Sequence, residues 1–186
     1  MLLNLIIILM LAWAFMLGYS RGLILQAIYS VGTIFAAFIA AGNYKALASS
    51  LSQWIPFASA TSSSHLLLFS DNLLFHLDEA FYAGIAFIII FVLVYTIIRI
   101  VGLFLKFAVA PLGRNGKILA GILGLCATYF GLQMFFVTLS LVPISTIQNY
   151  LSGSGLVRLM VLHTPITSSY FQNLFIETIT KINPLG

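Results

Sequence analysis

The sequence predicts an all-α integral membrane protein with four transmembrane helices in two hairpins, together with short amphipathic helices at the membrane interface. Hydrophobic residues make up 61% of the 186 residues and charged residues only 6%, whereas a soluble domain carries about 25% charged residues. Four apolar runs, each long enough to cross a hydrocarbon core, alternate with polar or basic segments. Such a chain has too few charges to cover a soluble surface, so we expect it to lie in a bilayer.

The first hairpin is predicted from two apolar runs, residues 2–18 and 23–41, on either side of a short turn. The turn holds Arg21, the only charged residue in the first 44. Gly18 and Gly22 bracket it, and glycine tolerates the backbone angles that a tight turn between helices requires. A signal peptide is the alternative for the first run, although no cation precedes that run.

Small residues recur at every fourth position in two of the spans. In the second span they are Gly32, Ala36 and Ala40. In the fourth span they are Ala120, Gly124 and Thr128. Such faces let helix backbones approach closely in lipid. We expect the second helix to pack on the first, because short turns make antiparallel neighbours; an oligomer interface is the alternative.

The segment 42–79 is predicted to be an outer connection between the second and third spans. Residues 44–54 could form a short interfacial helix, because lysine and tryptophan suit the headgroup zone. Residues 59–64 are predicted to form a small polar linker. Residues 65–77 form an amphipathic apolar piece that is too short to span, so we expect it to lie on the membrane surface or to dip into the bilayer.

The second hairpin is predicted from spans at 80–106 and 118–142 with a basic turn at 111–117. Arg99 lies late in the third span. One interpretation is that its side chain snorkels to the interface. The other is that it lines a polar path, because arginine at mid-membrane usually marks function.

The sequence after the fourth span has a different character. We divide the chain into a four-helix membrane domain at 1–143 and an external tail at 144–186. The tail contains two amphipathic stretches, 156–162 and 170–182, and neither is long enough to span.

The distribution of charge predicts the orientation. The two turns between paired spans carry five cations and no acid, counting Arg21, Arg99, Lys106, Arg114 and Lys117. The other side carries three cations and all four acids of the chain. Positively charged loops stay in the cytoplasm, so both termini are expected outside. The net charge of +4 therefore reflects topology, and no stripe of cations with interleaved aromatics suggests nucleic-acid binding.

The densest group of potential metal ligands lies in the outer connection. It comprises His65, His76, Asp78 and Glu79. Their spacing matches no established metal site, which needs three or four ligands that converge. The acids are better explained as a cap at the N-terminus of the third helix, where the helix dipole favours negative charge. The single cysteine, Cys126, allows no disulfide within the chain.

No catalytic motif is visible in the sequence. It contains no Gly-x-Ser-x-Gly, no His-Glu-x-x-His, no phosphate-binding loop and no pair of aspartates within a span. We therefore expect a protein that is not an enzyme and that uses no cofactor.

The turn Gly18-Tyr19-Ser20-Arg21-Gly22 after a first span, followed by a helix rich in small residues, resembles the colicin V production protein family, called CvpA. That family has a Gly-x-x-Arg-Gly turn at this place. Its fourth span follows a short basic connection, similar to Arg114-Asn115-Gly116-Lys117 here. The likeness covers about residues 1–143. The family often has an acid near the start of the chain, whereas this sequence has Asn4.

The resemblance implies a bacterial inner-membrane protein linked to toxin production or export and to envelope homeostasis. It implies no catalytic residues. Expected partners are membrane lipids and, through helix contacts, further copies or other membrane proteins. The alternative is a small channel or transporter subunit in which Arg21, Arg99 and the outer group around His65, His76 and Asp78 line a path.

Overall fold

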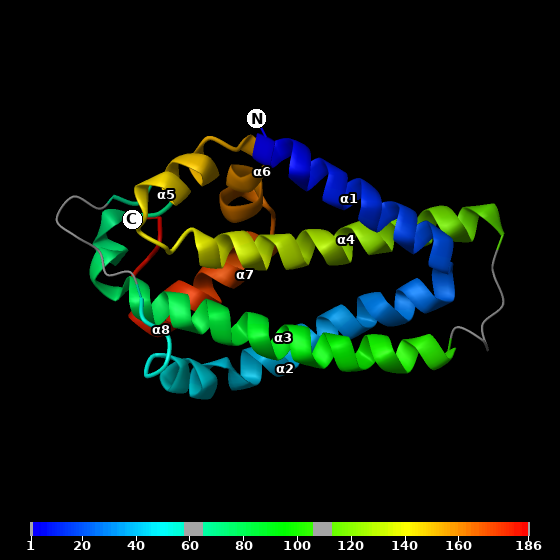
Figure 1. The fold of residues 1–186 in the computed structure, drawn as a ribbon, viewed down its shortest axis with the longest axis horizontal. Coiled ribbons are helices and arrows are strands. Elements are labelled where there is room, and N and C mark those ends of the chain that lie inside the picture. Colours follow the sequence, from blue (N-terminus) through cyan, green and yellow to red (C-terminus); the bar gives the residue numbers. More distant parts are fainter. Residues whose placement is uncertain (1, 58–64, 106–112, 186) are drawn as a thin grey trace.

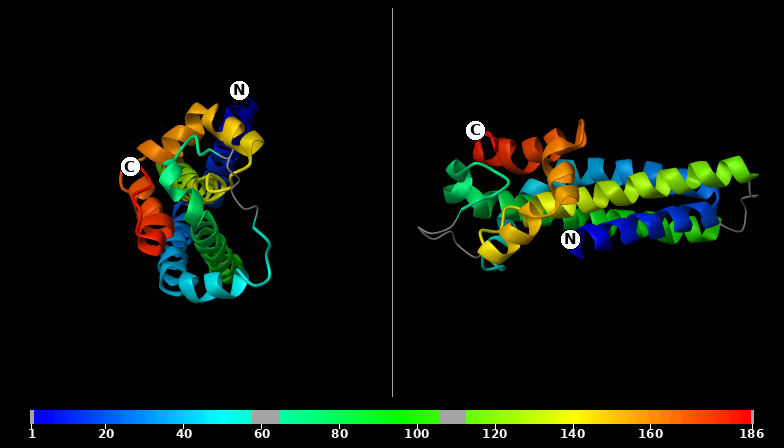
Figure 2. Two further views of the ribbon diagram at one scale, coloured as in Figure 1. Left: turned by 90° about the vertical axis from the view of Figure 1, so that its left-hand side faces the viewer. Right: turned by 90° about the horizontal axis from the view of Figure 1, so that it is seen from above.

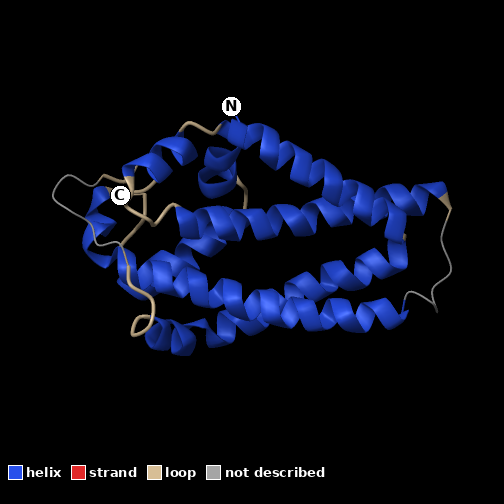
Figure 3. Ribbon diagram, in the orientation of Figure 1, coloured by secondary structure: helices blue, strands red, loops and turns tan. Residues whose placement is uncertain are grey.

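Four long helices form an elongated bundle in the computed structural model, which describes residues 2–57, 65–105 and 113–185. They are α1 (Leu2–Arg21), α2 (Leu23–Leu51), α3 (Leu77–Leu105) and α4 (Arg114–Leu139). The described residues contain no strand (Figure 3), which confirms the predicted all-α class. The linker at 59–64, Lys106 and the start of the basic turn lie outside the described residues.

All four long helices are apolar enough and long enough to cross a membrane. Their outward faces carry large apolar side chains that a soluble protein would bury; Ile34, Phe38 and Phe104 each expose more than 70% of their surface. Lipid is the natural environment of such a surface, since exposed apolar patches of this size mark contact with another apolar phase. The four spans therefore agree with those predicted from hydropathy.

The helices pair in a way that the sequence did not predict. Figure 1 shows α1 running beside α4 and α2 running beside α3, while α1 and α2 diverge from their shared turn. The expectation that α2 packs mainly on α1 is wrong. The helix faces that carry small residues contact other helices instead. A Cβ on Gly18 of α1 would overlap the carbonyl of Ala120 in α4, and a Cβ on Gly32 of α2 would lie 2.7 Å from Ile98 in α3.

The α1–α2 turn explains this divergence. Gly22 alone separates the two helices, with a φ of 85° that side chains rarely permit. Its backbone N–H donates to the Gly18 carbonyl at 3.2 Å, and its own carbonyl accepts from the Gln26 N–H at 3.1 Å. A turn of one residue leaves no slack for the helices to fold flat on each other, so each pairs with a helix of the other hairpin.

The boundaries of the outer connection also differ from those predicted. Helix α2 continues without a break to Leu51, so the separate interfacial helix expected at 44–54 does not form. Buried Tyr44 explains the continuation, because its hydroxyl donates to the Leu174 carbonyl at 2.9 Å. Most of residues 65–77 is a loop and the 3-10 helix η1 (Asp71–His76) rather than an amphipathic α-helix, and it packs inward through Leu66, Leu68, Phe69 and Leu73.

The tail folds back onto the bundle end opposite the basic turns (Figures 1 and 2). It consists of α5 (Ser145–Ser152), α6 (Gly155–Arg158), the π-helical η2 (Leu159–His163), α7 (Thr167–Gln172), η3 (Asn173–Glu177) and α8 (Thr178–Thr180). Phe171 and Phe175 are fully buried, with ring centroids 5.9 and 5.2 Å from that of Phe87 in α3. The tail therefore shares one core with the helices, and the division at residue 143 does not separate two packing units.

Candidate functional site: a groove with two arginines

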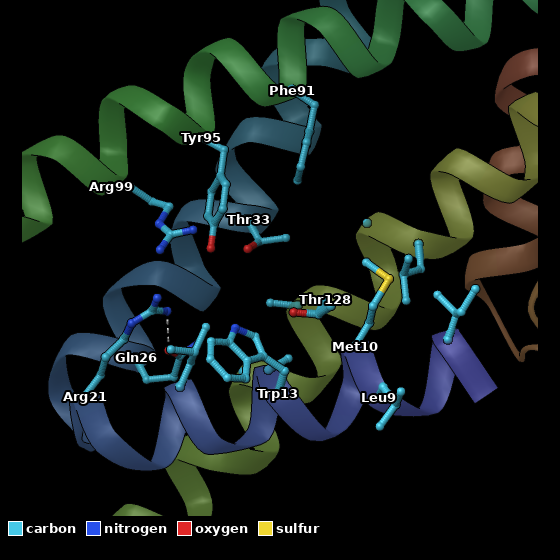
Figure 4. A pocket seen from close by; sticks show the side chains of 17 residues that line it. Leu9, Met10, Trp13, Arg21, Gln26, Thr33, Phe91, Tyr95, Arg99 and Thr128 are labelled. Carbon is cyan, nitrogen blue, oxygen red and sulfur yellow. Dashed lines mark hydrogen bonds between the residues drawn. The ribbon is translucent and has the colours of Figure 1, made fainter. Parts of the chain in front are cut away.

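The divergence of α1 from α2 opens a cavity among the four long helices. Its volume is about 590 Å³, within the ~300–1,000 Å³ typical of small-molecule sites. Figure 4 shows α1 and α3 on opposite sides of it. We call this cavity the arginine groove, and most of its wall is apolar: Leu9, Met10, Trp13, Leu17, Phe91 and Leu132.

The arginine groove is open along its side rather than enclosed. Leu9, Met10 and Trp13 line it, yet they keep 60%, 45% and 64% of their surfaces exposed. All three lie on α1, a span whose outer face is apolar throughout. In a bilayer, the open side of the groove would therefore face lipid chains.

One end of the groove carries two guanidinium groups. Arg21, the last residue of α1, and Arg99 of α3 both line it (Figure 4). The guanidinium carbon of Arg21 lies 5.3 Å from the ring centroid of Tyr29, and that of Arg99 lies 5.8 Å from the same centroid. Tyr95, one turn before Arg99, adds a second ring at 5.9 Å. Aromatic faces hold both cations beside the groove.

Neither arginine has a carboxylate partner among the residues that the structure describes. The four acids are Asp71 in η1, Asp78 and Glu79 at the start of α3, and Glu177 in the tail. Glu79 is 20 positions before Arg99 on the same helix, or about 30 Å at 1.5 Å per residue. The arginines are thus uncompensated cations at the end of an apolar groove.

Polar side chains of α2 and α4 continue from the arginines into the groove. Gln26 is 2% exposed, and its Oε1 accepts a hydrogen bond from Arg21 Nη1 at 3.4 Å. Its Nε2 donates to no acceptor within the described residues, and a Cβ on Gly124 would stand 3.5 Å from it. Thr33 and Thr128 also line the cavity. The groove therefore pairs a polar, cationic end with a long apolar wall.

The residues predicted from the sequence lie at the groove, at helix contacts, in the α1–α2 turn and in the outer connection. Arg21, Arg99, Gly124 and Thr128 come together at the arginine groove. Gly32, Ala36 and Ala40 are buried in α2, and Ala120 is buried in α4 against Gly18. Gly22 forms the turn itself.

The outer group does not assemble into one site. His65 Nδ1 lies 3.1 Å from Asp71 Oδ2, whereas His76 Nδ1 lies 3.9 Å from Glu79 Oε2, so the histidines belong to two separate exposed pairs. Across the described ranges, no cluster of three or more His, Cys, Asp or Glu side chains could hold a metal ion. None of these residues lines the arginine groove.

Sequence reasoning missed the polar face of α2. Gln26, Tyr29 and Thr33 follow one another at helical spacing, so they share one side of an otherwise apolar span. That spacing was a usable signal, because buried polar groups in a membrane helix need partners. The spacing of Tyr95 and Arg99, one turn apart, was a second such signal.

The chain was compared with known protein families, curated proteins and solved structures. The family model described as colicin V production protein matches residues 3–165. The chain is also 29% identical over 177 residues to a protein of Bacillus subtilis (strain 168) named "Uncharacterized transmembrane protein YshB", covering 94% of this chain and 98% of that one. No solved structure matches the chain.

Proposed function

Because this chain belongs to the colicin V production protein family, we propose that it supports toxin production or export and envelope homeostasis without acting as an enzyme. It would do so as a multi-pass protein of the bacterial cytoplasmic membrane. The observation that carries the proposal is the family match over residues 3–165, which includes all four spans and much of the tail. The match thus extends beyond the short turn motif around Arg21.

The arginine groove supports a role based on binding rather than chemistry. It offers two cations, an amide and hydroxyl groups beside an apolar wall. Its ionisable lining residues are Arg21, Tyr95 and Arg99, and arginine stays protonated, so it is a poor general base. Non-covalent recognition of a membrane component is the activity that these groups suit best.

A deletion strain tests the proposal. We expect loss of the gene to lower release of a secreted peptide toxin and survival under detergent, and a plasmid copy to restore both. A matched plasmid carrying Arg114→Gln should restore them as well, because Arg114 lies at the same end of the bundle but outside the arginine groove. Unchanged release and unchanged survival in the deletion strain would contradict the proposed role.

A channel or transporter subunit is the rival function. Arg21 and Arg99 share one cavity, as that rival requires, but His65, His76 and Asp78 do not line it. Purified protein in liposomes separates the two functions. The proposed role predicts no ion or solute flux above that of empty liposomes, whereas flux that Arg99→Gln abolishes would favour the channel.

A further inference from the structure

We infer that the arginine groove binds an anionic lipid, with the lipid's phosphate headgroup at Arg21 and Arg99 and a hydrocarbon chain along α1. This inference goes beyond the proposed function, because it names an occupant of the groove and can be measured on purified protein. The uncompensated charge of the groove, its polar lining, its shape and its open side all favour such a lipid.

The charge of the groove calls for an anion from outside the chain. Arg21 and Arg99 lie around one tyrosine ring, within 5.3 and 5.8 Å of its centroid. Two like charges near the hydrocarbon region are costly unless an anion compensates them. All four acids of the protein are elsewhere in the bundle. A phosphate group fits well, because arginine donates paired hydrogen bonds to phosphate oxygens.

The polar groups beside the arginines extend the headgroup site. The Gln26 Nε2 group is a donor with no acceptor within the described residues, and it lies between Arg21 and Gly124. A Cβ on Gly124 would stand 3.5 Å from this amide, which places the amide beside the surface of α4. The amide can therefore donate to a headgroup oxygen that the arginines already hold.

The shape of the groove fits a lipid chain attached to that headgroup. The α1 residues that line it run from Arg21 back to Ile6, which is about 22 Å along the helix. One leaflet of the hydrocarbon core is about 15 Å thick. The groove thus starts at the basic turns and extends past the depth of one leaflet.

The open side distinguishes a lipid from a soluble anion. Leu9, Met10 and Trp13 remain exposed along the groove, so a lipid can enter sideways from the bilayer. A soluble phosphate would use the cationic end only and would make no contact with this apolar wall. Basic pockets between transmembrane helices are known to hold anionic headgroups.

Trp13 provides a direct test. The chain has two tryptophans, and Trp54 lies outside the groove, so the full-length Trp54→Phe protein carries one reporter in the groove wall. We would reconstitute it in phosphatidylcholine vesicles that contain a minor fraction of brominated phosphatidic acid or of brominated phosphatidylcholine. We expect stronger quenching of Trp13 by the brominated phosphatidic acid.

Charge variants in the Trp54→Phe background test the headgroup site. We expect Arg21→Gln and Arg99→Gln each to lower the preference for phosphatidic acid about fivefold, which corresponds to about 1 kcal/mol per cation. The matched control is the double variant Arg114→Gln and Lys117→Gln, whose cations lie at the same end but outside the arginine groove. It should keep the preference.

A filling variant tests the chain site without changing charge. Gly131 lines the groove, and a Cβ there would meet no atom within 4 Å, so a side chain can start there without a clash and Gly131→Leu should occupy part of the groove. We expect it to reduce the quenching by brominated phosphatidic acid to the level of phosphatidylcholine. Gly42→Leu is the control, since Gly42 also has free space but lies outside the groove.

Several outcomes would overturn the inference. Equal quenching by the two brominated lipids would mean that the groove has no headgroup selectivity. An equal loss in the Arg114 and Lys117 variant would mean that diffuse surface charge attracts the lipid. Full recovery of fluorescence on adding inorganic phosphate would assign the site to a soluble anion. If the protein shows no preference for phosphatidic acid, the proposed cellular role is not contradicted. If the deletion strain behaves like the wild type, lipid binding is not contradicted.

Discussion

Gly124 of α4 packs directly against the backbone of Ala14 in α1, so that a Cβ on Gly124 would lie 2.8 Å from the Ala14 carbonyl oxygen. The same Cβ would stand 3.3 Å from the Cα of Gly18. Both neighbouring groups belong to a helix backbone, which cannot rotate away as a flexible side chain would. This contact fixes the separation of α1 and α4, both of which contribute residues to the wall of the arginine groove.

Gly124→Ala should therefore destabilise the bundle, by about 1–3 kcal/mol, because the added methyl group forces the two backbones apart. The control is Gly131→Ala on the same helix, where a Cβ meets nothing within 4 Å. It should keep or raise the stability, since alanine favours helix over glycine by about 1 kcal/mol. Thermal unfolding in detergent measures both, and equal midpoints for the two variants would mean that the α1–α4 contact is looser than described.

The tail offers a second prediction, which concerns buried amides. Gln172 Nε2 donates to the Val161 carbonyl at 2.7 Å and Gln133 Nε2 donates to the Met160 carbonyl at 2.6 Å. Both carbonyls belong to the π-helical segment η2. Gln172→Leu leaves a buried carbonyl without its donor, which should cost about 1–3 kcal/mol.

Limited proteolysis measures this effect, because a destabilised tail opens more often and is cleaved faster. The control variant is Asn149→Leu, which removes an exposed amide from the same tail. We expect faster cleavage of the tail in Gln172→Leu and an unchanged rate in Asn149→Leu. Identical rates would indicate that water or another donor replaces Gln172.

The four spans could be predicted from the sequence because hydropathy is a property of each segment alone. Helix pairing could not, because it depends on contacts between segments far apart in the chain. Gly18 meets Ala120 and Gly32 meets Ile98, and nothing in the local pattern names those partners. The two glycines correctly predicted a tight turn between the first two helices. They did not predict that Gly22 alone connects these helices and makes them diverge.

The candidate site was foreseeable only in parts. Arg21 stands out as a lone charge, and Arg99 could be interpreted as a snorkelling side chain or as part of a path. Their meeting around Tyr29 depends on the α2–α3 pairing and was not predictable from spacing. The packing of the tail on the bundle was not predicted, because its apolar residues, such as Phe171 and Phe175, come in segments too short to span.

The orientation gives a third prediction. With Cys126→Ala as background, single cysteines at Ser20, Ser62, Asn115 and Asn183 would be exposed to a thiol reagent that does not cross membranes. We expect labelling of intact cells at positions 62 and 183 only, because cationic turns stay in the cytoplasm. Permeabilised cells provide the control, in which all four positions should react. Labelling at position 20 in intact cells would reverse the predicted orientation.

The last prediction separates two roles of Arg21, a topology charge and a recognition group. The side chain stacks beside Tyr29 and donates to Gln26 at 3.4 Å. Lysine would keep the charge but lose the planar, two-pronged donor geometry of the guanidinium. We therefore expect Arg21→Lys to insert with the wild-type labelling pattern and to restore the deletion strain only in part.

Two other charge variants at the same end of the bundle separate these two roles of Arg21. Arg21→Glu should disturb both insertion and rescue, because it reverses the first charge that orients the chain. Arg114→Lys should rescue fully, since Arg114 lies outside the arginine groove. Full rescue by Arg21→Lys would reduce Arg21 to a topology charge. Partial rescue with normal labelling would instead require that the guanidinium geometry at the groove, and not merely its charge, is recognised in the cell.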